Sequence, residues 1–332
     1  MAQKRKLLEI QNLSINLQTS RGIAKVVDGV SFEIREGEIF GLVGESGSGK
    51  TMTALSIVRL LPPSARIVNG SIKFEGQELL EKNQSEMQLI RGRNIGMIFQ
   101  DSAASLNPVM KVGDQLIETI LTHNKVSLKK AEEIAIRLLK NVGIADVNVR
   151  LNQYPFQLSG GLKQRIMMAL ALAGNPKLLI ADEPTTSLDV TIQWQILSLI
   201  RKIREETRMA VMLITHNLGI VAMLCDRAAI MYAGKIVETA DVQTLFSNPL
   251  HPYTRMLISC IPRIEVKPER LTVIEGEVPD LLSPPTGCRF HPRCPIAREI
   301  CSIIQPKLLF KSETHAVSCL AYESEYGWSN TP

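Results

Sequence analysis

The sequence predicts an α/β fold followed by a loop-rich C-terminal extension. Three observations support this prediction. A glycine-rich loop, GESGSGKT (residues 44–51), lies between an apolar strand and a helix. A second apolar strand ends in two carboxylates, Asp182 and Glu183. Four cysteines lie in a proline-rich stretch near the C-terminus. The chain has 332 residues, 45% of them apolar, which is enough for a large core and two domains.

Charge and hydropathy exclude several classes of protein. The net charge of +5 is modest and the basic start, residues 4–6, is short for a nucleic-acid-binding arm, so we expect no nucleic-acid partner. No apolar run reaches the roughly 18 residues that span a bilayer, and the first thirty residues lack a signal peptide. We therefore expect a cytosolic chain, in which four clustered cysteines indicate a metal site more often than disulfides.

Residues 44–51 match G-x-x-x-x-G-K-[ST], the pattern of a phosphate-binding loop. Strand 38–43 precedes the loop, and a helix over residues 51–61, stopped by two prolines, follows it. This context argues against a chance glycine-rich turn. The glycines let backbone N–H groups face phosphate oxygens, and the helix N-terminus adds positive charge. Lys50 is expected to reach the β- and γ-phosphates, and Thr51 to bind Mg²⁺. The other nucleotide-binding residues predicted in the loop are Gly44, Ser46, Gly47, Ser48 and Gly49.

A phosphate-binding loop also occurs in kinases, GTPases and motor proteins, so it does not by itself identify the class of protein. The acidic strand reduces the number of candidate classes. Residues 178–182 are apolar up to the first carboxylate, as expected of a central parallel strand buried on both faces. Asp182 would hold Mg²⁺ through water, and Glu183 would orient or deprotonate the water that attacks the γ-phosphate. An acidic pair on the surface is the alternative, and the segment PTTSLD (184–189) argues against it.

The segment LSGGL (158–162) lies about two dozen residues before the acidic strand. Ser159, Gly160 and Gly161 are expected to cap a helix that runs to Ala173, and an exposed helix N-terminus binds phosphate. Alone, the segment would be an ordinary capped helix. Its position ahead of the acidic strand favours a nucleotide-binding role.

Two polar residues follow further strands. His216 follows strand 209–215, the next strand after the acidic one. The C-terminal ends of these two strands are expected to open onto the same crevice, where His216 would contact the γ-phosphate. Gln100 follows strand 94–99 and would coordinate Mg²⁺ and the attacking water. Either residue alone would be read as structural, and the assignment depends on the order of all the motifs.

Together these motifs resemble those of the ABC transporter ATPases over residues 1–245. The resemblance implies a P-loop NTPase with a RecA-like core, an antiparallel β-subdomain and a helical insert at about 101–175. It also implies that two such ATPases close head to tail around two ATP molecules, so the signature would serve the partner's nucleotide. The matching segments are Walker A (44–51), the Q-loop (Gln100), the signature (158–162, with Ser159, Gly160 and Gly161 acting in trans), Walker B (Asp182, with catalytic Glu183), the D-loop (187–189) and the H-loop (His216).

Two features depart from that family. Leu162 occupies a signature position that is often Gln. The family usually stacks an aromatic side chain on adenine, but no Phe, Tyr or Trp precedes Phe32. Ile23 or Val26 would pack against adenine instead. The aromatic stacking that they cannot provide is worth about 1–3 kcal/mol per base in nucleic-acid binders.

Periodicity suggests where the subdomains lie. Strands are expected at 7–17, 30–34, 39–43 and 71–74, and helices over 112–141, with 129–140 clearly amphipathic. In the resembling family, a groove beside the Q-loop receives short helices of the membrane subunits, and residues 101–108 would line it. An ordinary loop is the alternative.

The predicted extension covers residues 246–332, where prolines are frequent. Its four cysteines are Cys288, Cys294, Cys301 and Cys319, spaced more widely than the pairs of common zinc modules. A helix could open at Pro295, but helical spacing from Cys294 to Cys301 would place their α-carbons about 10 Å apart, so a turn near Cys294 is expected. Four thiols in such a segment suit a [4Fe–4S] cluster or Zn²⁺, and unligated thiols are the third option.

The His-Pro-Tyr sequence 251–253 and the segment 279–295 resemble the C-terminal extension of dipeptide/oligopeptide ABC importer ATP-binding subunits. That resemblance implies a [4Fe–4S] cluster on the four cysteines, and it makes Leu162 less unusual, because this subfamily commonly has Met there. His251 is interpreted as structural, and Cys225 and Cys260 as core residues.

The resemblance implies an ATPase that energises uptake of di- or oligopeptides from the cytoplasmic face of the membrane. Its expected partners are a related but non-identical ATPase, two transmembrane permease subunits and, indirectly, an extracytoplasmic substrate-binding protein. Importers of nickel or glutathione share the extension and remain alternatives. A soluble ABC ATPase acting on DNA or the ribosome is a further alternative, although the chain lacks long coiled coils and a second ATPase half. A redox sensor, in which the cluster gates ATP turnover, is also permitted.

Overall fold

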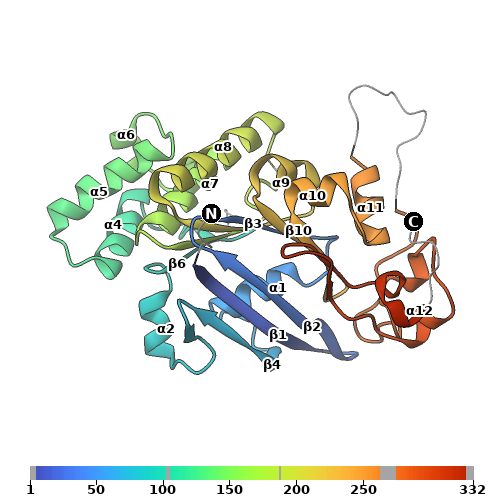
Figure 1. Ribbon diagram of the computed structural model, residues 1–332. Coiled ribbons are helices and arrows are strands. Elements are labelled where there is room, and N and C mark those ends of the chain that lie inside the picture. The colour runs from blue at the N-terminus through green and yellow to red at the C-terminus, as the bar shows by residue number, and fades with distance from the viewer. Residues whose placement is uncertain (1–4, 102–104, 187, 262–273, 327–332) are drawn as a thin grey trace. The chain divides into compact units, whose positions relative to one another are not determined.

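The computed structural model describes residues 5–101, 105–186, 188–261 and 274–326 (Figure 1). They form two compact units. The first contains residues 5–7, Arg35–Glu38 and Glu81–Ile214, and the second contains Leu8–Ile34, Ile39–Leu80 and the described chain from Thr215 onward. Within the described ranges, no helix is both long and apolar enough to cross a bilayer. The predicted domain boundary after residue 245 stays a prediction.

Three parallel strands form the sheet of the first unit, in the order β6, β7, β8. All five residues of β7 are buried, which agrees with the uninterrupted apolar sequence of a strand covered on both faces. Asp182 of β7 lies opposite Ile214 of β8, so both strands end at the same edge. The bounds are β6 (Ile95–Ile98), β7 (Leu178–Asp182), β8 (Ala210–Thr215), α7 (Gly160–Leu172) and α8 (Val190–Thr207).

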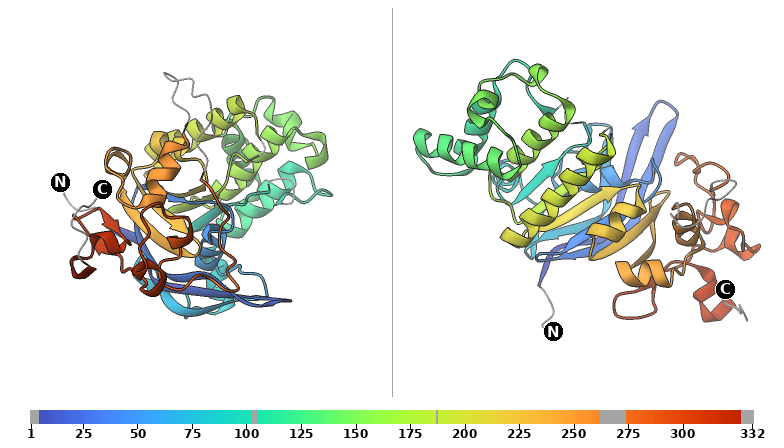
Figure 2. Two further views of the ribbon diagram at one scale, coloured as in Figure 1. Left: turned by 90° about the vertical axis from the view of Figure 1, so that its right-hand side faces the viewer. Right: turned by 90° about the horizontal axis from the view of Figure 1, so that it is seen from above.

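The helical insert of the first unit gathers α4, α5 and α6, which lie together in every view of Figures 1 and 2. The predicted amphipathic helix is α5. It buries Ala131, Ala135 and Leu139, which recur every four residues, and the Ser127 hydroxyl caps it by accepting the Lys130 N–H. The bounds are α4 (Val112–His123), α5 (Leu128–Asn141), α6 (Val147–Leu151), α2 (Gln84–Ile90) and a 3₁₀ turn (Pro155–Gln157).

The second unit begins with an antiparallel sheet in the order β2, β1, β4, β5. The predicted strands are present, and two start earlier than expected. β2 starts at Gly22 because Ala24, Val26 and Val27 also contribute to the core, and β4 starts at Ala65. The bounds are β1 (Lys6–Thr19), β2 (Gly22–Arg35), β4 (Ala65–Phe74) and β5 (Gln77–Glu78).

The second sheet of this unit places β3 parallel to β9, and β10, β12 and β11 follow antiparallel. The helix after β3 is shorter than predicted. It ends at Ile57 because Arg59 takes a φ of 52°, a left-handed conformation that ends the helix before the two prolines. The bounds are β3 (Ile39–Val43), α1 (Lys50–Ile57), α9 (Leu218–Leu224), β9 (Arg227–Tyr232), β10 (Lys235–Asp241), α10 (Val242–Ser247), β11 (Leu309–Phe310) and β12 (Ala316–Val317).

The C-terminal part of the second unit is loop-rich, as predicted, but it has a core. Tyr232, Tyr253 and Phe290 are fully buried and pack edge to face or tilted, with centroids 4.7–5.3 Å apart. The chain turns at Cys294, and only Ile300–Ile303 form a helix in place of the one considered from Pro295. The remaining bounds are α11 (Pro252–Ser259), α12 (Ile300–Ile303) and 3₁₀ turns at His291–Arg293, Leu320–Tyr322 and Ser324–Tyr326.

Candidate functional site

The phosphate-binding loop of the second unit folds around its own lysine. The Lys50 ammonium donates hydrogen bonds to the carbonyls of Gly44 and Glu45, at 2.7 and 2.8 Å, and to the Ser48 hydroxyl at 3.3 Å. The Lys50 residue is only 5% exposed. The loop leads directly into the N-terminus of α1, as predicted, and the contacts of Lys50 with the β- and γ-phosphates stay a prediction.

Two glycines allow the close packing of this loop. A Cβ on Gly44 would lie 2.0 Å from the carbonyl oxygen of Met231, the penultimate residue of β9. Gly49 has a φ of 102°, and a Cβ there would lie 2.3 Å from the carbonyl oxygen of Val26. The loop thus packs directly against backbone of its own unit, and no larger side chain fits at either position.

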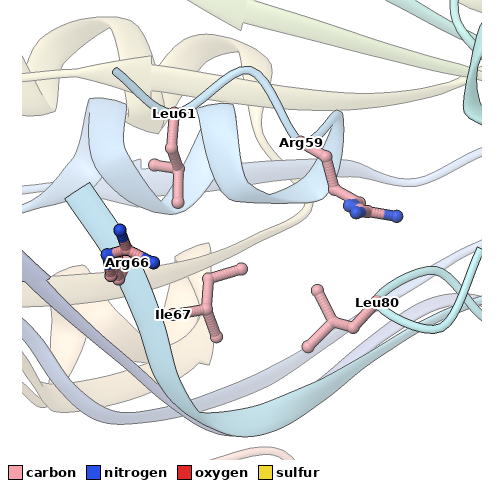
Figure 3. Close-up of a pocket in the computed structure, with 5 residues that line it drawn as sticks. All are labelled: Arg59, Leu61, Arg66, Ile67 and Leu80. Atoms are coloured by element: carbon pink, nitrogen blue, oxygen red, sulfur yellow. The ribbon is translucent and has the colours of Figure 1, made fainter. Parts of the chain in front are cut away.

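A cavity of about 440 Å³ lies beyond the other end of α1 (Figure 3). Its lining side chains combine two guanidinium groups with aliphatic groups. Because Arg59 and Leu61 follow the C-terminal end of α1, this cavity is separate from the phosphate-binding loop at the helix N-terminus. The lining residues are Arg59, Leu61, Arg66, Ile67 and Leu80.

The first unit brings together two of the predicted catalytic residues at the end of β7. The Gln100 amide donates a hydrogen bond to the Glu183 carboxylate at 3.2 Å, and the Thr186 hydroxyl donates to the same oxygen at 2.8 Å. Glu183 has a φ of 44°, and Asp182 before it is 2% exposed. Sequence reasoning did not single out Thr186, although it lies in the segment that supported the acidic pair.

The predicted signature forms the start of α7. The Ser159 hydroxyl accepts the Leu162 N–H at 3.5 Å, and Gly160 is the first helical residue. Ser159 and Gly160 are exposed, whereas Leu158 is buried and anchors the segment. A Cβ on Gly161 would lie 3.1 Å from a methyl group of Ile192 in α8, so the glycine permits close helix packing.

The remaining predicted nucleotide-site residues are distributed between the units. Thr51 and His216 belong to the second unit and are exposed, as is Ile23, while Val26 is buried. Gln100, Asp182, Glu183 and the signature belong to the first unit. Ser187 of the predicted D-loop and residues 102–104 of the predicted groove lie outside the described residues.

The four cysteines of the extension are all free thiols. Burial raises the pKa of Cys288 to about 11, with a further contribution from neighbouring Cys294 and Cys301. Burial likewise raises the pKa of Cys319 to about 12, and all three other thiols add to the increase. Within the described ranges, no three His, Cys, Asp or Glu side chains are arranged to hold a metal ion. The thiols are therefore neighbours without forming a ligand set.

Two residues of the extension contact the phosphate-binding loop, and sequence reasoning missed both contacts. The Arg293 guanidinium lies 3.1 Å from the Glu45 carboxylate, and the Tyr253 hydroxyl accepts the Glu45 N–H at 3.1 Å. Glu45 is the second residue of the GESGSGKT loop. The resemblance marked the segments that contain Arg293 and Tyr253, but no signal in the sequence linked them to Glu45.

Comparison with known proteins gives two family matches. The model for "ABC transporter" matches residues 27–186, and the model for "Oligopeptide/dipeptide transporter, C-terminal region" matches residues 237–301. The dipeptide transport ATP-binding protein DppD of Bacillus subtilis is 48% identical over 95% of this chain and 94% of its own length. The oligopeptide transport ATP-binding protein AppD of the same organism is 45% identical over 96% of this chain and 98% of its own length.

Among solved structures, the dimeric post-hydrolysis state of the ATP-binding cassette MJ0796, bound to ADP and Pi, aligns with a TM-score of 0.64. It shares 26% sequence identity and covers 71% of this chain and 99% of its own. CbiO1 from Clostridium perfringens, part of an ABC transporter complex, aligns with a TM-score of 0.63 and has the same fold. It shares 23% identity over 74% of this chain and 92% of its own.

Proposed function

Because the chain belongs to the family of ATP-binding subunits of peptide ABC transporters, we propose that it hydrolyses ATP to energise uptake of di- or oligopeptides across the cytoplasmic membrane. The observation that carries this proposal is the contact between Gln100 and Glu183 at the end of β7. It pairs an amide with the carboxylate that would receive the proton of attacking water. Nickel and glutathione fit less well, since the relatives and the C-terminal model are described by peptide transport.

The nucleotide would be held by the loop at residues 44–51. Its backbone N–H groups and Lys50 would bind the phosphates, while Glu183, oriented by Gln100 and Thr186, would position the water for in-line attack. His216 would contact the γ-phosphate. Thr51 and Asp182 offer the oxygen ligands that Mg²⁺ prefers, and the bound ion would neutralise charge on the β- and γ-phosphates.

A second, related cassette would complete each site. The exposed Ser159 and Gly160, together with Gly161, would contact ATP bound to the partner, because a helix N-terminus with free N–H groups favours a phosphate. The dimeric form of the MJ0796 cassette supports this arrangement. In peptide importers we expect the partner to be a similar but non-identical subunit.

Two transmembrane permease subunits would bind at the cytoplasmic face of the membrane, and an extracytoplasmic binding protein would deliver the peptide. The described residues 107–109 suit this docking role. The Gln115 side chain of α4 fixes the backbone of Asn107 through two hydrogen bonds of 3.0 Å, and neighbouring Val109 is 79% exposed. A rigid loop that presents an exposed apolar side chain is suited to receive a short helix.

We also propose that Cys288, Cys294, Cys301 and Cys319 bind a [4Fe–4S] cluster, with Zn²⁺ as the alternative. The donor set supports this proposal, because all four thiols are free, and burial and neighbouring thiols raise the pKa of Cys288, Cys294 and Cys319. A bound cation would favour their thiolate forms. The thiols would have to converge further than they do in this structure. The role proposed for such a group is to stabilise the fold.

Peptide uptake tests the function directly. Cells that lack the chromosomal copy would be complemented with the wild-type chain or with Lys50→Ala, and uptake of a labelled tripeptide would be measured. We expect uptake with the wild-type chain alone, because Lys50→Ala loses the ammonium that binds the phosphates. If the wild-type chain restored nickel uptake and no peptide uptake, the substrate assignment would be wrong.

A further inference from the structure

Glu45 connects the phosphate-binding loop to the C-terminal extension. Both oxygens of its carboxylate accept hydrogen bonds from Nη1 of Arg293, at 3.1 and 3.2 Å, and its backbone N–H donates to the Tyr253 hydroxyl at 3.1 Å. Its carbonyl oxygen accepts a hydrogen bond from Lys50. One residue of the loop is therefore fixed at its side chain and both backbone polar groups, and two of these contacts come from the extension.

Arg293 is held rigidly on the extension side. Its Nε donates to the carbonyl of Glu275 at 2.9 Å, and its Nη2 to the carbonyl of Ile274 at 3.3 Å. Nη1 also reaches the Tyr232 hydroxyl at 3.3 Å, and the guanidinium lies over the Tyr232 ring, 5.7 Å from its centroid. The Arg293 side chain is 6% exposed and that of Glu45 is 27% exposed, so the pair is partly shielded from water.

Tyr253 is equally constrained. It is fully buried, and its ring packs against Tyr232 and Phe290 with centroids 4.7 and 5.3 Å away. Tyr232 ends β9, next to Met231, whose carbonyl oxygen lies against Gly44. The first two residues of the loop thus rest on a buried aromatic cluster that includes residues of the extension.

We propose that Arg293 and Tyr253 are positioning residues that couple the C-terminal extension to nucleotide binding through Glu45. A phosphate-binding loop loses less conformational entropy on binding a nucleotide when its backbone already has the conformation of the bound state. Because Glu45 also orients Lys50 through its carbonyl, releasing Glu45 frees both the backbone and the ammonium. The proposal rests on residues 44–51 being the nucleotide site.

The coupling is reciprocal. If the extension strengthens ATP binding, then ATP binding must stabilise the contacts of the extension by the same free energy. Bound ATP is therefore expected to slow backbone hydrogen exchange in residues 288–301, which include Arg293 but lie outside the phosphate-binding loop.

A double-mutant cycle tests the proposal. Equilibrium binding of a fluorescent ATP analogue would be measured on the full-length chain, for wild type, Glu45→Gln, Arg293→Met and the double variant. We expect Arg293→Met to raise the Kd by about fivefold, the lower end of typical coupling between sites. The double variant should bind no more weakly than the weaker single variant, and Arg293→Lys should restore part of the affinity.

Two control variants change the extension without touching the loop. Arg255 donates to the Pro249 carbonyl and the Tyr322 hydroxyl, and Tyr322 donates to the Leu250 carbonyl. Arg255→Met is matched to Arg293→Met, and Tyr322→Phe to Tyr253→Phe. The controls should lower thermal stability while leaving the Kd unchanged, whereas both test variants should raise the Kd.

The outcomes separate this inference from the proposed function. If the wild-type chain does not bind ATP, or if Lys50→Ala binds it as tightly as the wild type does, the assignment of the nucleotide site is wrong. If the wild-type chain binds ATP but Arg293→Met and Tyr253→Phe leave the Kd unchanged, or if the effects of Glu45→Gln and Arg293→Met simply add, the coupling is overturned. Equal Kd changes in the control variants would also overturn it, since general destabilisation would then explain the effect.

Discussion

Nδ1 of His251 accepts a hydrogen bond from the backbone N–H of Tyr253 at 3.1 Å. The imidazole thereby caps α11 at its N-terminus, in the position usually taken by Ser, Asp or Asn. The His251 backbone N–H donates to the Glu238 carboxylate at 2.8 Å, and the His315 Nε2 lies 2.8 Å from its other oxygen. The structural role predicted for His251 thus consists of capping the helix that carries Tyr253.

The cap makes stability depend on pH. Burial lowers the pKa of His251 from 6.5 to about 4, with Glu238 opposing the shift and Arg255 adding to it. Between pH 6.5 and 4, His251 is therefore protonated in the unfolded chain but stays neutral in the folded chain. The free energy of unfolding should be highest above pH 6.5 and fall towards pH 4, by up to about 3 kcal/mol from this residue. Urea denaturation across this range measures the effect.

His251→Asn is the matched control for the pH effect. The Asn side chain can accept the Tyr253 N–H without titrating. The variant should lose part of the dependence of the unfolding free energy on pH between 6.5 and 4. An identical profile for His251→Asn and the wild type would show that His251 is not the responsible group.

The local structure around the proposed nucleotide motifs could be predicted because each motif is local in sequence. The GESGSGKT pattern needs only a strand before it and a helix after it. Gln100 and Glu183 could be placed together because β6 and β7 are adjacent parallel strands that end at one edge. The periodicity of residues 129–140 likewise predicted α5, since one helix face alone is buried.

The contacts that the sequence did not predict are long-range or depend on backbone detail. Arg293 and Glu45 are 248 residues apart, and neither belongs to a pattern that specifies the other. The early end of α1 depends on the left-handed conformation of Arg59, which is uncommon for a residue other than glycine. The aromatic core of Tyr232, Tyr253 and Phe290 was not predicted because these residues come from three separate segments, and Tyr232 of β9 lies outside the predicted extension.

Glu183→Gln should retain ATP binding but nearly abolish turnover. The amide keeps the shape of the side chain and can still accept the Gln100 hydrogen bond, but it cannot accept a proton from water. Removing a general base lowers the rate by about 100-fold or more. Phosphate release by the transporter assembled with its partner subunits, alongside ATP binding by the chain, measures both quantities. Glu205→Gln on the exposed face of α8 is the matched control. Unchanged turnover in Glu183→Gln would show that Glu183 does not act in the hydrolysis step.

Gly44→Ala should impair both folding and nucleotide binding. The new methyl group would lie 2.0 Å from the backbone oxygen of Met231, so the loop or β9 must move. Gly47→Ala is the matched comparison, because nothing lies within 4 Å of its Cβ and only the left-handed φ of 77° is strained, at a cost of about 1–2 kcal/mol. Thermal denaturation should show a larger loss for Gly44→Ala. An equal or smaller loss would mean that the loop does not need this close approach.

Cys294→Ser should remove the metal if the four thiols form the proposed site. Serine is nearly isosteric but is a poor ligand for iron–sulfur clusters, so iron per chain and absorbance near about 400 nm should both fall after anaerobic purification. Cys260→Ser is the matched control, because this thiol lies at the end of α11 and outside the predicted ligand set.

The metal site would also stabilise the surrounding segment, and proteolysis beyond about residue 280 should therefore become faster in Cys294→Ser alone. If the wild-type chain is colourless and contains one zinc ion, the four cysteines form a structural zinc site and not an iron–sulfur cluster. A metal content unaffected by Cys294→Ser, with no change in proteolysis, would contradict ligation by this residue.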